Sequence, residues 1–161
     1  MTTNRIVLIV AYEGVQLLDV AGPAEVFSTA TKINGGAGYR LLIATPSGDA
    51  VCTDSGLTLG ADIALADAPA HVDTLIGAGG LGAFPAAESA DLLTALAPLR
   101  TARRVCSVCT GTLLLGAMGW LRRGARRRRV AHRGAVRGVT LSHTGAFSRQ
   151  IARGRRTEVA S

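Results

Sequence analysis

Cys109 is the residue of this 161-residue chain whose setting most clearly indicates chemistry. It stands between an apolar, β-branched run at 104–108 and a segment, 110–121, with leucines, alanine and methionine at helical spacing. Thr110 and Gly111 follow it directly. A nucleophile on a sharp strand-to-helix turn, with glycine two residues later, is the nucleophile-elbow arrangement. Because a helix start favours negative charge, a cysteine placed there can react as a thiolate near neutral pH.

The same cysteine allows other interpretations. Free cysteines are commonly buried and inert. Cys106 and Cys109 also spell C-x-x-C, which is typical of thioredoxin-like redox sites. Three strand residues span about 10 Å, however, whereas a disulfide needs a Cα separation of about 4.4–6.8 Å. A zinc site would need a second ligand pair, which we do not find, so we expect no metal and favour a reactive Cys109.

The elements that must position Cys109 follow from the apolar runs. Runs at 5–11, 39–45, 72–76 and 103–108 predict buried strands. Enough chain for a crossover separates each run from the next, so we expect parallel strands of one sheet.

Helical patterns fill the connections. Residues 17–30 predict a helix with an interruption at Gly22–Pro23, where a kink or a second helix start is expected. Residues 83–101 predict one amphipathic helix, and residues 50–59 a hairpin-like excursion. The leucines on the apolar side of the amphipathic helix are Leu92, Leu93, Leu96 and Leu99. This order predicts an α/β three-layer sandwich with a mostly parallel sheet and a site at the carboxyl ends of its strands.

Composition divides the chain into two unlike parts. Residues 1–119 hold six Lys/Arg and ten Asp/Glu, a net charge of −4, whereas residues 120–161 hold twelve arginines and Glu158, a net charge of +11. We predict a domain over 1–121 and a basic tail over 122–161 that is the least ordered part. We expect no membrane helix and no signal peptide, because no apolar run reaches spanning length and no charged segment precedes one. Three cysteines suit a reduced, cytoplasmic setting.

Four segments taken together resemble the ThiJ/PfpI superfamily, which has the class I glutamine amidotransferase-like fold. They are LLDVAGPAEVF, TDSGLTLGAD, VDTLIGAGG and SVCTGTLLLGAMGWL. The closer resemblance is to the sensor domain of AraC-type transcriptional regulators and to isocyanide hydratases. It implies a flavodoxin-like sheet. We expect a small-molecule ligand or substrate, a homodimer and no cofactor.

The resemblance assigns roles to particular residues. Cys109 looks like the elbow nucleophile, and Asp19 falls at the acidic position after the first strand, where a carboxyl group faces the sulfur. Gly79 and Gly80 match the double glycine whose N–H groups form an oxyanion pocket with that of Thr110. Without the resemblance, Asp19 also fits a simple helix start and the glycines a simple turn. Thr110 stands where protease-like and deglycase-like members often have histidine, which argues against those activities.

Other matches are less close. Gly111 completes the turn beside the expected ligand site, Ala78 stands where proline is usual, and His132 lies in the basic tail with little matching context. The family domain normally continues with further strands and a closing helix, whose pattern we do not find in 122–161. We therefore expect a truncated or frame-shifted C-terminal part without a helix-turn-helix region.

Three functions fit these observations. The first is a ligand- or stress-sensing domain in transcription regulation. The second is a small lyase or hydratase in which Cys109 attacks an electrophilic carbon and Asp19 moves the proton, since two acids in contact share one proton. In the third, the arginine tail binds nucleic acid, because phosphate contacts need only basic charge.

Overall fold

Strand β1, Arg5–Val10, is the centre of the fold in this computed structural model, which describes residues 4–121. Its residues Val7–Val10 are apolar and at most 1% exposed. β1 pairs in parallel with β2 (Tyr39–Thr45) on one side and with β6 (Thr74–Gly77) on the other. Cover on both faces of the sheet explains why β1 is one continuous apolar run.

The five-stranded sheet has the order β5-β2-β1-β6-β7 and is parallel throughout. β7 (Arg104–Ser107) pairs with β6, and β5 (Ile63–Ala64) pairs with β2. The four strands expected from the sequence are confirmed, including their direction. A separate antiparallel pair, β3 (Val51–Cys52) and β4 (Thr58–Leu59), confirms the hairpin-like excursion.

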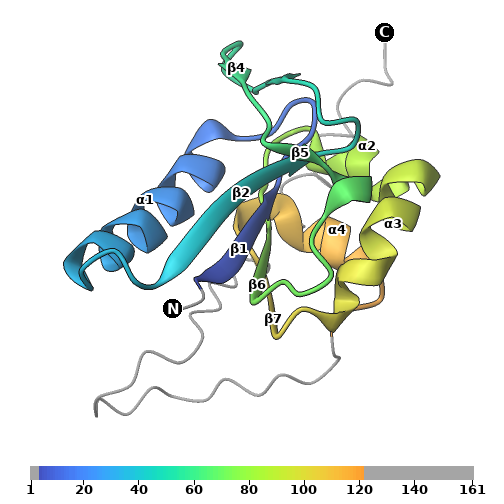
Figure 1. Cartoon of the computed structure of the whole chain (residues 1–161). Coiled ribbons are helices and arrows are strands. Elements are labelled where there is room, and N and C mark those ends of the chain that lie inside the picture. Colours follow the sequence, from blue (N-terminus) through green and yellow to red (C-terminus); the bar gives the residue numbers. More distant parts are fainter. Residues whose placement is uncertain (1–3, 122–161) are drawn as a thin grey trace, which may run out of the picture.

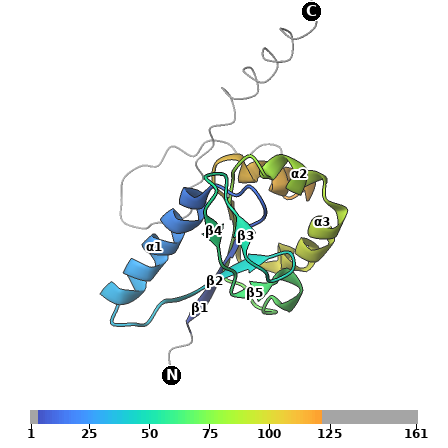
Figure 2. The ribbon, with the colours of Figure 1, turned by 90° about the horizontal axis from the view of Figure 1, so that it is seen from above.

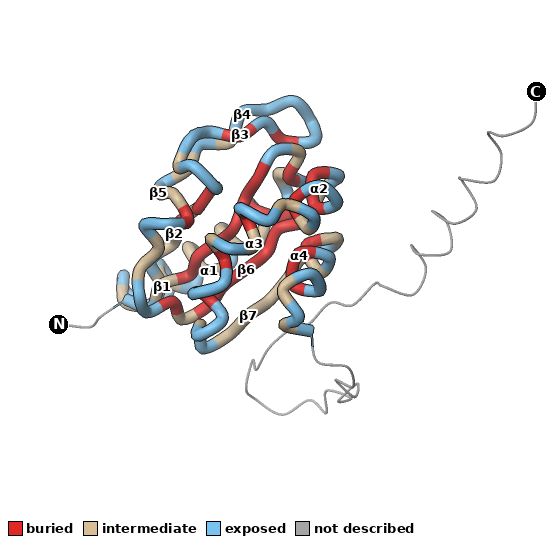
Figure 3. Tube along the Cα trace, turned by 90° about the vertical axis from the view of Figure 1, so that its right-hand side faces the viewer, coloured by how far each residue is buried: buried red, intermediate tan, exposed pale blue. Residues whose placement is uncertain are grey.

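Helices cover both faces of the sheet, as Figures 1 and 2 show. α1 (Leu17–Ile33) lies on one face, whereas α2 (Ala83–Glu88), α3 (Ala90–Leu96) and α4 (Thr112–Ala117) lie on the other. This is the expected three-layer α/β arrangement. Buried residues concentrate on the central strands and on the helix sides that face them (Figure 3).

The prediction of a single amphipathic helix over 83–101 is wrong, because the helix is interrupted at Ser89. Ser89 adopts an extended backbone and ends α2. Its Oγ then accepts the N–H of Leu92 at 3.3 Å, which caps the start of α3. A 3₁₀ turn, Ala97–Thr101, follows α3. The leucines still serve the core: Leu92, Leu96 and Leu99 are buried and Leu93 is half-buried.

Of the two alternatives expected at Gly22–Pro23, a second helix start is excluded, because α1 is one continuous helix. The helix continues through the proline, which removes only one backbone hydrogen bond at this position. Packing against β2 supports the helix beyond the proline: the rings of Phe27 and Tyr39 meet edge to face, with centroids 4.7 Å apart.

α4 is shorter than the helix predicted over 110–121. Gly119 adopts a φ of 66° and stops it. The N–H groups of Gly119 and Trp120 bond the carbonyls of Gly116 and Leu115, both at 3.0 Å, which is the Schellman C-cap. No helix within residues 4–121 combines the length and the apolar character needed to cross a membrane.

Charge is distributed unevenly along the strand direction. The six cationic residues of 4–121 lie at strand starts or in the turns and helix ends that lead into them. They are Arg5, Lys32, Arg40, Arg100, Arg103 and Arg104. The acids Glu13, Asp19 and Asp54 instead follow strands β1 and β3. The basic end of the sheet is therefore opposite the end where the strands finish.

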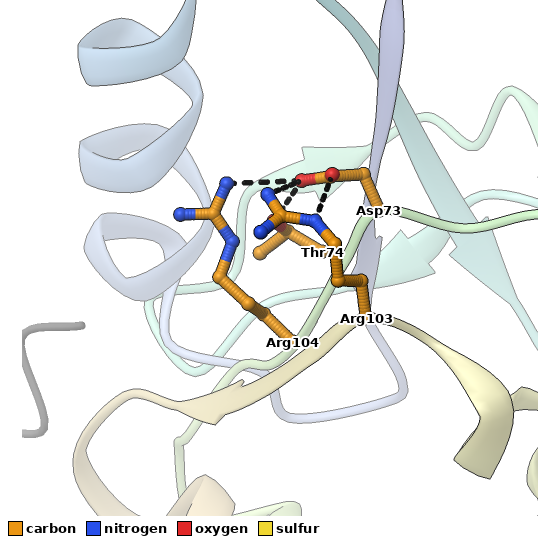
Figure 4. Close-up of polar contacts among 4 residues, drawn as sticks. All are labelled: Asp73, Thr74, Arg103 and Arg104. Carbon is orange, nitrogen blue, oxygen red and sulfur yellow. Dashed lines mark hydrogen bonds and ion pairs between the residues drawn. The ribbon is translucent and has the colours of Figure 1, made fainter. Parts of the chain in front are cut away.

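Asp73 gathers two of these arginines at the start of β6 (Figure 4). Arg103 donates to its two carboxylate oxygens at 2.6 and 3.1 Å, Arg104 donates at 3.1 Å and the Thr74 hydroxyl at 2.8 Å. Burial alone would raise the pKa of Asp73, but these hydrogen bonds and the charge of Arg103 hold it lower, at about 2. The cluster joins the starts of β6 and β7.

Candidate active site around Cys109

Cys109 follows β7 at the carboxyl end of the sheet. It is the one non-glycine residue of 4–121 with a positive φ, 51°, and its side chain is exposed. This backbone region is costly for a cysteine, and such strain often marks functional sites. Cys109–Gly111 form a 3₁₀ turn, and α4, only six residues long, begins at Thr112. The helix dipole expected directly behind the sulfur is therefore weaker than the sequence predicts.

Gly111 allows the turn to press against the end of β6. A Cβ atom at this position would lie 2.2 Å from the carbonyl oxygen of Gly77 and 2.7 Å from that of Ala78. No real Cβ tolerates such distances, so a side chain here would push the elbow away from β6. The glycine two residues after Cys109 is thus required by backbone packing.

Asp19 lies in the first turn of α1 and is 9% exposed. Its Oδ2 accepts the N–H of Gly79 at 3.1 Å. Burial raises the pKa of Asp19, and the hydrogen bond from Gly79 offsets part of that rise. Within residues 4–121, this carboxyl group makes no hydrogen bond to the Cys109 sulfur.

The structure brings Asp19, Gly79 and Thr110 together. A Cβ atom at Gly79 would lie 2.6 Å from Asp19 Oδ2, 2.8 Å from the Thr110 nitrogen and 2.9 Å from Thr110 Oγ1. Only glycine fits in this space. Cys109 is next to Thr110 in the chain and therefore lies close to the loop after β6, in which the Gly79 N–H bonds Asp19.

The Thr110 hydroxyl hydrogen-bonds both backbone polar groups of Gly80. Its Oγ1 accepts the Gly80 N–H at 2.9 Å and donates to the Gly80 carbonyl at 3.0 Å. The Gly79 N–H donates to Asp19. Two of the three N–H groups that the resemblance assigns to an oxyanion pocket, those of Gly79 and Gly80, therefore already donate to protein acceptors.

Tyr12 is a site residue that the sequence analysis missed. It lies two residues after the end of β1, is 3% exposed and donates its hydroxyl to the Ala78 carbonyl at 2.5 Å. Burial raises its pKa, and the nearby charges of Asp19 and Cys109 raise it further. The available signal was a tyrosine at the end of a buried strand, because a buried hydroxyl needs a partner.

The three cysteines are free thiols in different surroundings. Cys106 lies in β7 and packs against the core, and burial raises its pKa although Arg104 opposes the rise. Cys52 in β3 is exposed, like Cys109, but lies on no elbow. Within residues 4–121 no three His, Cys, Asp or Glu side chains gather as a metal site would require.

A groove of about 430 Å³ begins beside the site rather than over it. Its lining includes Tyr12, Glu13, Pro85, Ser89 and Asp91. A second hollow of about 210 Å³ lies between the segment after β5 and α3. Neither includes Cys109 or Asp19. His132 and the basic tail lie outside the described residues.

The sequence matches the DJ-1/PfpI family over residues 4–141, and the chain belongs to this family. The match continues past residue 121, where the arginine-rich composition begins. A Streptomyces lividans protein described as an uncharacterized protein in the cpoL 5′ region is 43% identical over 120 residues, which make up 73% of this chain and 82% of that protein.

Solved structures share the fold. A ThiJ/PfpI family protein from Pseudomonas syringae superposes with a TM-score of 0.64 at 28% identity, over 74% of this chain and 48% of that one. Drosophila melanogaster DJ-1beta superposes with a TM-score of 0.59 at 19% identity, over 73% of this chain and 61% of that one. The chain thus spans about half to three fifths of the length of these two structures.

Proposed function

We propose that this chain is a ligand- or stress-sensing domain of the DJ-1/PfpI family in which Cys109 is the responding thiol. The observation that supports this most is an exposed cysteine held at a positive φ on a strand-to-helix turn. The proposal includes a small-molecule ligand, a homodimer and a role in transcription regulation, as the resemblance to AraC-type sensor domains implies. The signal would pass to a partner that binds DNA.

Asp19 is proposed as the group that exchanges a proton with Cys109. Burial raises the pKa of its carboxyl group, so the protonated form persists to higher pH than in an exposed aspartate. Two neighbouring acids resist ionising together, so one proton is shared between them. With the Gly79 and Gly80 N–H groups already engaged, a developing oxyanion finds few donors, which argues against acyl transfer.

A hydratase-like activity is a second candidate, favoured by the buried carboxyl group beside the elbow. The Cys109 sulfur would add to the carbon of an isocyanide, Asp19 would give that carbon a proton, and water would then displace the sulfur. The net reaction adds one water and restores both groups. Formation of the formamide from an alkyl isocyanide by the wild-type chain, but not by Cys109→Ala, would support it. If no formamide forms, sensing remains the proposed function.

The test of the proposed function is the order in which the thiols react. A limiting dose of iodoacetamide at neutral pH, read by peptide mass, should label Cys109 first and Cys106 last. Cys52 is the built-in control, because it is exposed without an elbow. In Asp19→Asn the pH profile of Cys109 labelling should change, because the proposed proton partner of the thiol is removed. Labelling led by Cys52 would refute the assignment of Cys109 as the nucleophile. An unchanged pH profile in Asp19→Asn would remove Asp19 from the proposed mechanism.

A further inference from the structure

The peptide unit between Ala78 and Gly79 is held at both ends. Its carbonyl accepts the hydroxyl of Tyr12 at 2.5 Å, and its N–H donates to Asp19 Oδ2 at 3.1 Å. A peptide unit is planar and its C=O and N–H share delocalised electrons. Tyr12 and Asp19 are therefore connected through one rigid, polarisable group.

Both anchoring side chains are buried and come from different elements. Tyr12 follows β1, Asp19 belongs to α1, and the peptide between them follows β6, at 0% exposure for Ala78. The Ala78 N–H bonds the carbonyl of Val10 at 3.3 Å, which ties the same loop to β1. Rotation of this peptide would break both side-chain hydrogen bonds at once.

We propose that Tyr12 is a positioning residue for Asp19, acting through the Ala78–Gly79 peptide to aim its N–H at the carboxylate and to strengthen that hydrogen bond. The proposal rests on the acid–base role proposed for Asp19. A donor on the carbonyl of a peptide makes the N–H of the same peptide a stronger donor, because hydrogen bonds in series polarise one another. A stronger donor favours the charged carboxylate and so counteracts burial.

Among residues 4–121, few other charges act on Asp19. Tyr12 faces it and stays uncharged, and Cys109 contributes its thiol from the elbow. Glu13 and Asp54, the acids of the neighbouring loops, each accept a backbone N–H elsewhere. No Lys or Arg within residues 4–121 pairs with Asp19. The peptide N–H is thus the contact that stabilises its charge.

The Gly79 amide reports on this arrangement, because its chemical shift follows protonation of Asp19. We would titrate the ¹⁵N-labelled full chain as Cys109→Ser, so that the thiol does not contribute. Adding Tyr12→Phe removes only the hydroxyl, and the midpoint should rise by roughly 0.2–0.6 of a pH unit. Tyr39→Phe is the matched control, since Tyr39 packs on Phe27, and should leave the midpoint unchanged.

A second variant covers the case in which Tyr12→Phe does not fold. In a Tyr39→Phe chain grown with 3-fluorotyrosine, Tyr12 carries the only fluorinated ring, since the chain has two tyrosines. The more acidic hydroxyl is a stronger donor, so the midpoint should fall. Equal midpoints, or shifts of both variants in one direction, would overturn the proposal. Labelling led by Cys52 would refute the proposed function, and Cys109 labelling that does not depend on Asp19 would remove the acid–base role of Asp19; both outcomes leave this titration interpretable.

Discussion

Replacing Asp73 by asparagine should remove a pH-dependent part of the stability. The carboxyl group has a pKa of about 2, against an ordinary value of 3.8, because two arginines and a threonine donate to it. That difference corresponds to at most about 2 kcal/mol in the free energy of unfolding. The Arg103 side chain is 56% exposed, so solvent screening reduces the expected contribution to about 1 kcal/mol.

The sign of the effect follows from the lowered pKa. The stabilisation is fully present above pH 4 and is lost as the pH falls towards 2, because protonation breaks the ion pairs. Asp73→Asn should therefore be less stable than the wild type at pH 7, by about 1 kcal/mol, and the difference should shrink towards pH 3.

Urea unfolding, followed by the fluorescence of the single tryptophan, Trp120, measures this difference. Asp67→Asn is the matched control, because Asp67 is exposed and forms no ion pair within residues 4–121. A difference between wild type and Asp73→Asn that stays constant from pH 7 to pH 3 would refute the reasoning. It would show that shape at this position matters and charge does not.

Two further predictions concern the backbone of the site. Gly111→Ala should lower the free energy of unfolding by about 3 kcal/mol, because the new Cβ meets the Gly77 carbonyl, whereas Gly22→Ala, with nothing within 4 Å, should raise it by about 0.5–1 kcal/mol. Equal urea midpoints for these variants would contradict the packing argument. Thr110→Val should cost about 1–3 kcal/mol and speed exchange of the Gly80 amide, because both polar groups of Gly80 lose their partner. Thr110→Ser should retain both properties, and if the two Thr110 variants behave alike the hydroxyl has no structural role.

The sheet could be predicted from the sequence because its strands are covered on both faces. Continuous apolar runs such as β1 have few other solutions in a chain of this length. Helix ends were harder to predict, because single residues set them. Ser89 stops α2 by adopting an extended backbone and capping α3, and Gly119 stops α4. Both residue types favour such positions, but only the packed structure decides whether they act.

The site was predictable in its residues and much less in its contacts. The strand-to-helix turn with Cys109 and Gly111 follows from local sequence. The two hydrogen bonds between Thr110 and Gly80 depend on how the turn at Cys109 packs against the loop after β6. No local sequence pattern predicts that packing. Tyr12 was missed for the same reason, because an aromatic residue at the end of a buried strand first suggests core packing.

The separation of charge along the strands has a consequence for what reaches Cys109. Residues 4–121 carry six cations and ten acids, and the cations sit at the end remote from the elbow. The electrostatic potential of this part of the molecule therefore depletes anions near the sulfur and leaves neutral molecules unaffected. The depletion extends over a Debye length of about 8 Å at physiological ionic strength. To the extent that residues 4–121 set the potential, uncharged electrophiles meet the thiol at their bulk concentration, whereas carboxylates and phosphates meet it at a lower one.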